Sequence, residues 1–96
     1  NNLYLLSLHS RIIIETETES IFLVRGENLL NCCQGQTLSL LPLGLPAHGV
    51  SSEGLKWELN NATLNTHFKS ISNICLKEMV SIKINQGELI CCLNRM

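Results

Sequence analysis

Residues 55–59 read Leu-Lys-Trp-Glu-Leu and carry the sharpest strand signal in the sequence. The two leucines and Trp57 fall on one parity of the stretch, and the two charged residues fall on the other. Such alternation of apolar and polar side chains is typical of a half-buried β-strand. The stretch therefore predicts a strand that turns Trp57 toward a core and ends at an Asn60–Asn61 turn.

Shorter strand signals flank this stretch on both sides. They are rich in β-branched residues and are separated by turn-forming residues at intervals of about ten, which favours strands over helices. We count seven to eight strand candidates and no helix, and so expect one all-β domain over residues 1–96. Besides 55–59, the candidates are 11–18, 20–24, 29–33, 71–76, 79–84 and 88–93, with a further apolar run at 3–8.

The middle of the chain, residues 34–54, contains both prolines and four of the six glycines. We expect a long loop here. Pro42 interrupts the apolar run 38–45, which restricts that run to an edge strand at best because proline cannot donate a ladder hydrogen bond. Residues 46–53 are expected to be mobile.

Size and charge exclude several classes of protein. The 96 residues suffice for one domain only. The formal net charge of −1 offers no concentrated basic face for nucleic acid. No apolar stretch approaches the roughly 18–20 residues that cross a bilayer, and the run at 3–8 is too short for a signal peptide. The chain starts without Met, so we expect a mature product or a fragment of a larger chain.

Five cysteines in a chain of this size suggest an oxidising compartment. Cys32–Cys33 and Cys91–Cys92 are adjacent pairs, and neighbouring side chains on a strand point to opposite faces. Parity with the flanking leucines favours Cys91 as the inward member of its pair, whereas the first pair stays ambiguous. Two alternatives remain open, a core disulfide or buried reduced thiols. The sequon Asn61-Ala62-Thr63 agrees with a secreted chain.

The order Cys, Trp, Cys over many short strands resembles the immunoglobulin-like β-sandwich. Residues 24–32 are similar to the turn and strand before the first core cysteine, 55–61 to the strand with the buried tryptophan, and 85–91 to the run before the second cysteine. The chain departs from the family at Asn85, where an Asp is usual, and at Leu89, where a Tyr is usual. The resemblance implies a disulfide between Cys32 and Cys91 with Trp57 packed against it in the core.

Within this superfamily, residues 88–94 are similar to a strand of the Ig-like amino-terminal module of the granulocyte colony-stimulating factor receptor group. This resemblance implies an extracellular or cell-surface receptor module that binds a cytokine or another protein, is glycosylated at Asn61 and is not an enzyme. Two alternatives are a small disulfide-rich secreted effector without the Ig-like fold, and an orphan fragment without evolved activity.

Other chemistry finds little support in the sequence. None of the histidines lies at zinc-site spacing from another His or a Cys, and no cofactor-binding motif occurs. We therefore expect no metal, no cofactor and no catalytic residue. Glu15, Glu17 and Glu19 would share one face of a strand, as an acidic stripe for a basic partner or, in the simpler interpretation, as a solvated surface. The histidines are His9, His48 and His67.

Overall fold

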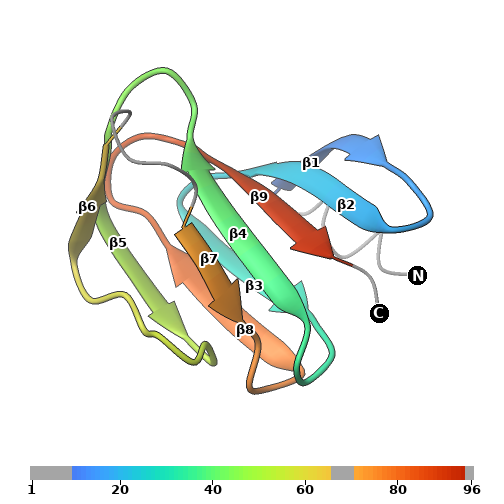
Figure 1. Cartoon of the computed structure of the whole chain (residues 1–96). Helices are drawn as coiled ribbons and strands as arrows, with labels where there is room; N and C mark the ends of the chain where they lie inside the picture. The colour runs from blue at the N-terminus through green and yellow to red at the C-terminus, as the bar shows by residue number, and fades with distance from the viewer. Residues whose placement is uncertain (1–9, 66–70, 95–96) are drawn as a thin grey trace.

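A computed structural model describes residues 10–65 and 71–94 (Figure 1). The apolar run at 3–8, His9 and His67 lie outside these ranges. The described part contains nine β-strands and no helix, so the predicted all-β class is confirmed. Every strand pairing in it is antiparallel.

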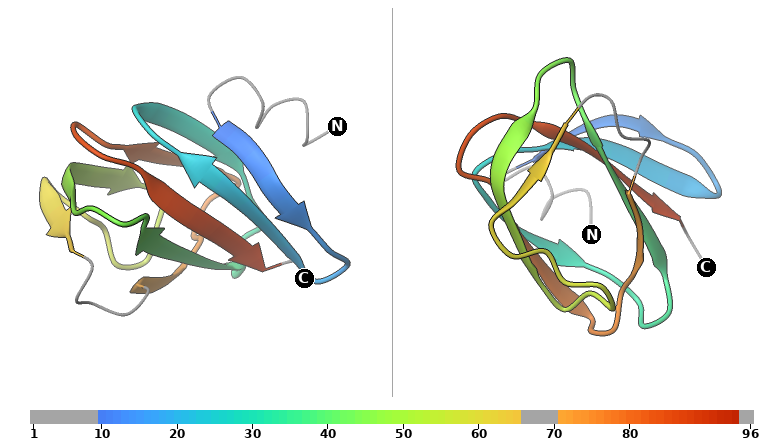
Figure 2. Two further views of the ribbon diagram at one scale, coloured as in Figure 1. Left: turned by 90° about the horizontal axis from the view of Figure 1, so that it is seen from above. Right: turned by 60° about the vertical axis from the view of Figure 1, so that its left-hand side comes forward.

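The strands form two sheets. The five-stranded sheet has the order β1-β2-β9-β4-β7, and the four-stranded sheet has the order β3-β8-β5-β6. Seen from above, the sheets lie as two layers (Figure 2). The strand bounds are β1 (Ser10–Glu15), β2 (Glu19–Val24), β3 (Glu27–Asn31), β4 (Thr37–Pro42), β5 (Ala47–Glu53), β6 (Ala62–Leu64), β7 (Ile71–Ile74), β8 (Met79–Lys83) and β9 (Leu89–Asn94).

The core lies between the two layers and follows from the period-2 pattern of the strands. In the five-stranded sheet, Cys91 at the centre of β9 is paired with Phe22 of β2 on one side and Leu40 of β4 on the other. In the four-stranded sheet, Leu30 of β3 is paired with Val80 of β8. All five side chains are buried, so alternate residues of both sheets meet in one apolar interior.

The strand order does not confirm the finer, Ig-like prediction. In an immunoglobulin sandwich the last strand occupies the edge of its sheet. Here the last strand, β9, lies in the interior of the five-stranded sheet, between β2 and β4. The coarser prediction of antiparallel sheets in two layers holds, with nine strands where seven to eight were expected.

The expected long loop at 34–54 is wrong, because two strands lie within it. β4 is an inner strand, contrary to the edge position predicted for it, and it tolerates Pro42 because this proline is its last residue. Gly44 lies in the following turn with φ 83°, and Pro46 immediately precedes β5. The prolines and glycines therefore mark the strand ends.

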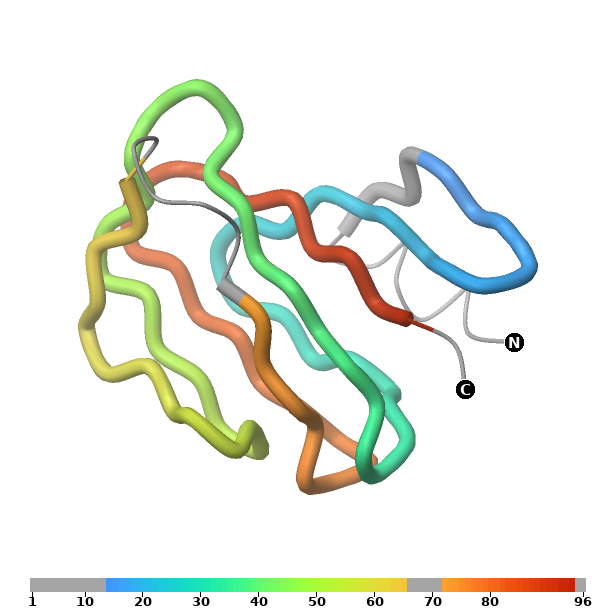
Figure 3. Tube along the Cα trace, viewed as in Figure 1, coloured from blue at the N-terminus to red at the C-terminus, as the bar shows by residue number. Residues whose placement is uncertain are grey.

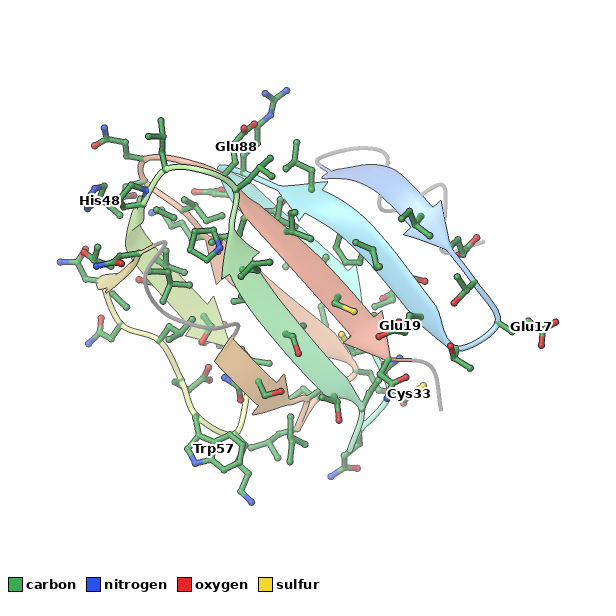
Figure 4. The ribbon with its side chains drawn as sticks, turned by 45° about the horizontal axis from the view of Figure 1, so that its top comes forward. Glu17, Glu19, Cys33, His48, Trp57 and Glu88 are labelled. Atoms are coloured by element: carbon green, nitrogen blue, oxygen red, sulfur yellow. The ribbon has the colours of Figure 1, made fainter. Side chains whose placement is uncertain are left out.

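Glu15, Glu17 and Glu19 form neither the acidic stripe nor the solvated strand face considered for them, because Glu17 lies in a turn. Glu15 ends β1, Glu19 begins β2, and Glu17 lies at the tip of the hairpin between them (Figure 4). The Thr16 hydroxyl organises this turn by accepting hydrogen bonds from the backbone N–H groups of Thr18 (3.2 Å) and Glu19 (3.0 Å). The three carboxylates thus belong to a chain reversal and do not share one strand face.

Cys91 faces inward as the strand parity predicted, and the structure resolves the ambiguous first pair in favour of Cys32, but the cysteines form no bridge. Cys32 and Cys91 are buried, whereas Cys33 is exposed, and all five cysteines are free thiols. The expected Cys32–Cys91 disulfide is therefore absent. Cys32 follows the end of β3, and its thiol donates a hydrogen bond to the Leu30 carbonyl (3.8 Å). The neighbouring thiol of Cys75 and burial both raise the pKa of Cys32. Burial likewise raises the pKa of Cys91.

Gly49 in β5 allows the close approach of the β8–β9 turn. Its φ is 67°, and a Cβ at this position would lie 2.7 Å from the side-chain carbons of Asn85. We expect Gly49→Ala to lower the free energy of unfolding by about 1–3 kcal/mol more than Gly44→Ala, since overpacking adds to the backbone strain. Gly44 is the matched control, because it has a positive φ and open space around it. Urea denaturation of both variants measures the difference, and equal losses would contradict the close packing.

The free thiols predict that stability is independent of reducing agent. The melting temperature should be the same with and without dithiothreitol, as followed by circular dichroism. A native disulfide in a small domain contributes about 2–5 kcal/mol. A clear fall in melting temperature on reduction would therefore contradict the thiol state described here.

Candidate functional site

The sequence Leu-Lys-Trp-Glu-Leu lies in the loop between β5 and β6 and not in a strand. After β5 the chain reverses at Gly54, with φ 104°, and returns alongside β5 toward β6 (Figure 3). Leu55 is buried, with 2% of its surface exposed, whereas Trp57 is 55% exposed. The expected core position of Trp57 is therefore wrong, because the backbone curls between two leucines that do pack inward. Its indole projects away from the sheets (Figure 4).

The backbone of Trp57 is held by one side-chain amide. Asn73 of β7 accepts a hydrogen bond from the Trp57 N–H at its Oδ1 (3.0 Å) and donates one from its Nδ2 to the Trp57 carbonyl (2.7 Å). Asn73 is only 1% exposed. Hydrogen bonds made by a buried side chain are costly to lose, because the remaining partner is left unpaired. Two hydrogen bonds from one buried side chain thus fix the backbone that carries the exposed indole.

Backbone hydrogen bonds fasten the rest of the loop to the end of β7. The Lys56 N–H donates to the Ile74 carbonyl, and the Leu76 N–H donates to the Gly54 carbonyl, each at 2.8 Å. Leu55 forms an isolated bridge with Cys75. Residues 54–57 are therefore docked on the end of β7, and the ring of Trp57 is presented from a backbone that hydrogen bonds fix in place.

The carboxylate of Glu58 turns back into the same loop. It accepts hydrogen bonds from the Ser52 hydroxyl (2.6 Å), the Gly54 N–H (2.8 Å) and the Leu55 N–H (3.3 Å). Burial alone would raise the pKa of Glu58, but these hydrogen bonds and the nearby Lys77 outweigh it and lower the pKa. Glu58 is accordingly ionised at neutral pH.

The face of the indole attracts cations. The ammonium group of Lys56 lies 4.7 Å from the centroid of the Trp57 ring. This is a cation–π distance, and such contacts strengthen where the cation is desolvated. An exposed aromatic face on a docked loop can stack against a flat ligand and favours one that carries positive charge.

The other predicted features do not join this site. His48 lies in β5 with its side chain exposed at another edge of the molecule (Figure 4), near the hydroxyl of Thr63 at 3.5 Å. Asn61 is exposed in the β5–β6 loop with φ 52°. Within residues 10–65 and 71–94, no group of three or more His, Cys, Asp or Glu side chains could hold a metal ion. The same ranges contain no helix suited to spanning a bilayer.

The sequence alone does not predict that Asn73 and Glu58 hold the loop that carries Trp57. Asn73 lies inside an apolar strand candidate, and its one signal is a polar residue at an inward position. The alternation of residues 55–59 predicts that Glu58 lies on the solvated face of a strand. Its role depends on the chain reversal at Gly54, which the alternation of residues 55–59 concealed.

Comparison with known proteins identifies a family for most of the chain. Residues 13–89 match the family model described as thiamin pyrophosphokinase, vitamin B1 binding domain. No curated protein matches the chain.

Solved structures of low sequence identity share the fold. A thiamine pyrophosphokinase from Bacillus subtilis is 20% identical with a TM-score of 0.78, over 91% of this chain and 42% of that chain. One from Geobacillus thermodenitrificans is 15% identical with a TM-score of 0.75, over 82% and 38%. One from Candida albicans is 19% identical with a TM-score of 0.70, over 84% and 32%. The chain thus spans well under half the length of these proteins.

These findings correct the functional expectations. The resemblance to Ig-like receptor modules is wrong, since the matching family is a domain of a pyrophosphokinase. The expectations of a non-enzymatic receptor, an extracellular location and a protein partner are wrong with it, because the matching family is described as a vitamin B1 binding domain of an enzyme. The disulfide-rich effector is excluded by the free thiols. The glycosylation predicted at Asn61 depended on secretion, and the family match removes that basis.

The support under Trp57 predicts a specific effect of removing the Asn73 amide. Asn73→Ala should lower the free energy of unfolding by about 1–3 kcal/mol, because it leaves backbone groups of the loop unpaired. Acrylamide should also quench the fluorescence of Trp57, the one tryptophan of the chain, more strongly. The matched control is Ser72→Ala, which removes a single hydroxyl contact to Ser39 from the exposed side of β7. Equal quenching in both variants would contradict the role of Asn73.

Proposed function

Because the chain belongs to the family of thiamin pyrophosphokinase vitamin B1 binding domains, we propose that it binds thiamin and that Trp57 is the ring on which the vitamin stacks. The observation that carries the proposal is the exposed indole on a backbone fixed by the buried Asn73. A large exposed aromatic side chain costs solvation free energy unless a partner covers it, and few single residues contribute more to binding.

The chemistry of thiamin fits this ring. Thiamin consists of a flat aminopyrimidine joined to a thiazolium, whose nitrogen carries a permanent positive charge. Both rings can stack on an indole, and the thiazolium adds a cation–π attraction. The ammonium group of Lys56 already lies over this ring, so we propose that thiamin displaces it or stacks on the opposite face of the indole.

The order of the loop favours binding. When a loop samples many conformations, its apparent affinity is the intrinsic affinity multiplied by the fraction of time that it spends in the competent conformation. The hydrogen bonds from β7 to the backbone of Lys56 and Trp57 limit such sampling before any ligand arrives. We therefore propose a largely pre-formed surface for thiamin.

The transfer of a diphosphate group is part of the proposal for the whole enzyme. The similar solved structures are more than twice as long as the portion that this chain matches. We propose that this chain supplies the thiamin-binding surface of such a pyrophosphokinase, and that the machinery for group transfer is provided by the portion that the match does not cover.

Titration with thiamin tests the proposal. Thiamin should change the emission of Trp57 and give a saturable heat of binding in calorimetry. Trp57→Ala should weaken binding about tenfold or more, which corresponds to about 1.4 kcal/mol. Leu29→Ala, which removes an exposed apolar side chain on the outer face of β3, is the control and should bind as the original chain does.

The ligand provides a second control. An uncharged thiazole alcohol, which lacks the positive nitrogen, should bind more weakly than thiamin if the indole face recognises the cation. Absence of any response to millimolar thiamin, or equal binding by the Trp57→Ala variant, would contradict the proposal.

A further inference from the structure

Glu58 has an unusual arrangement for a surface carboxylate, because all three of its hydrogen bonds are made to residues 52–55, at the end of β5 and the start of the loop. Oε1 accepts from the Ser52 hydroxyl and the Leu55 N–H, and Oε2 accepts from the Gly54 N–H. Backbone N–H groups at a chain reversal have no ladder partner and need one. Glu58 thus satisfies the two donors that the reversal at Gly54 leaves free.

Ser52 extends this hydrogen-bond network from the end of β5 to the residues that follow Trp57. Its hydroxyl donates to Glu58 and accepts from the Leu59 N–H at 2.8 Å, while its own N–H donates to the Leu59 carbonyl at 2.9 Å. The end of β5 and the residues after Trp57 are therefore tied together. The carboxylate closes the loop on one side, and the amide of Asn73 holds its centre on the other.

We propose that Glu58 is a positioning residue for thiamin, whose carboxylate closes the 52–59 loop and so fixes the direction in which Trp57 presents its ring. This proposal rests on the proposed function for the ligand, but its effect on the loop is independent of any ligand. Hydrogen bonds to an ionised acceptor are about twice as strong as neutral ones, which favours a carboxylate for this task. Glu58 itself need not touch thiamin.

Three variants test the proposal in the full chain. Glu58→Ala removes all three hydrogen bonds, Glu58→Gln keeps an oxygen acceptor but loses the charge, and Glu53→Gln removes a nearby exposed carboxylate as the matched control. We expect thiamin to bind about tenfold more weakly to Glu58→Ala and about threefold more weakly to Glu58→Gln, following the lower fraction of competent loop. Glu53→Gln should bind as the original chain does.

Fluorescence of the single tryptophan measures the loop without ligand. Acrylamide quenching of Trp57 should rise and its anisotropy should fall in Glu58→Ala, with a smaller change in Glu58→Gln. Far-ultraviolet circular dichroism should show the sheets unchanged in both variants. This combination separates a local loss of order from a failure to fold.

Comparison of the pH profiles of the original chain and Glu58→Gln separates the titration of Glu58 from general acid destabilisation. The pKa of Glu58 is lowered in the folded protein, with Lys77 as the charged group of the described residues that faces it. The closed loop should therefore persist at every pH above the ordinary carboxyl value of about 4.5 and open only as pH falls through the lowered value. The quenching of Trp57 should rise in that range in the original chain and stay flat in Glu58→Gln.

The outcomes separate this proposal from the proposed function. If Glu58→Ala leaves both Trp57 quenching and thiamin affinity unchanged, the positioning role is wrong even though thiamin binds. If thiamin does not bind the original chain but the quenching and pH effects appear, the role of Glu58 in ordering the loop stands and the ligand assignment fails.

Discussion

The two hydrogen bonds between the Asn73 amide and the Trp57 backbone are the constraint on which the candidate site depends. They join a loop of one sheet to a strand of the other, since the loop follows β5 and Asn73 belongs to β7. A buried amide with both of its functional atoms used holds a backbone in one place more firmly than apolar packing does. The indole can therefore remain exposed without the loop becoming disordered.

The interior of the molecule achieves its stability without covalent links. Its buried cysteines pack as small apolar side chains, as free cysteine commonly does. Cys91 fills the space between Phe22 and Leu40, and burial keeps its thiol protonated. The apolar packing of these side chains thus replaces the disulfide that the sequence suggested.

The sequence alone predicts the strands better than it predicts the site. The strands at 20–24, 79–84 and 88–93 were found because their alternation comes from real burial of one face. β5 is not predicted, and β4 is predicted only as an edge strand, because prolines are expected to break strands, whereas Pro42 and Pro46 lie only at strand ends. The stretch at 55–59 was misassigned because Leu55 and Leu59 do pack inward, which imitates a strand, while hydrogen bonds from distant residues set the direction of Trp57. Contacts such as these have no local signature.

The position of β9 has a consequence for how the molecule assembles. β2 and β4 are both bonded to β9 and not to each other, so neither can complete its ladder until the residues from Leu89 onward are available. Pairings between such distant segments form slowly, because the intervening chain must first give up its freedom. During synthesis, the edges of β2 and β4 that pair with β9 would remain without their partner until β9 is made. Formation of the complete five-stranded sheet would therefore be a late step in folding.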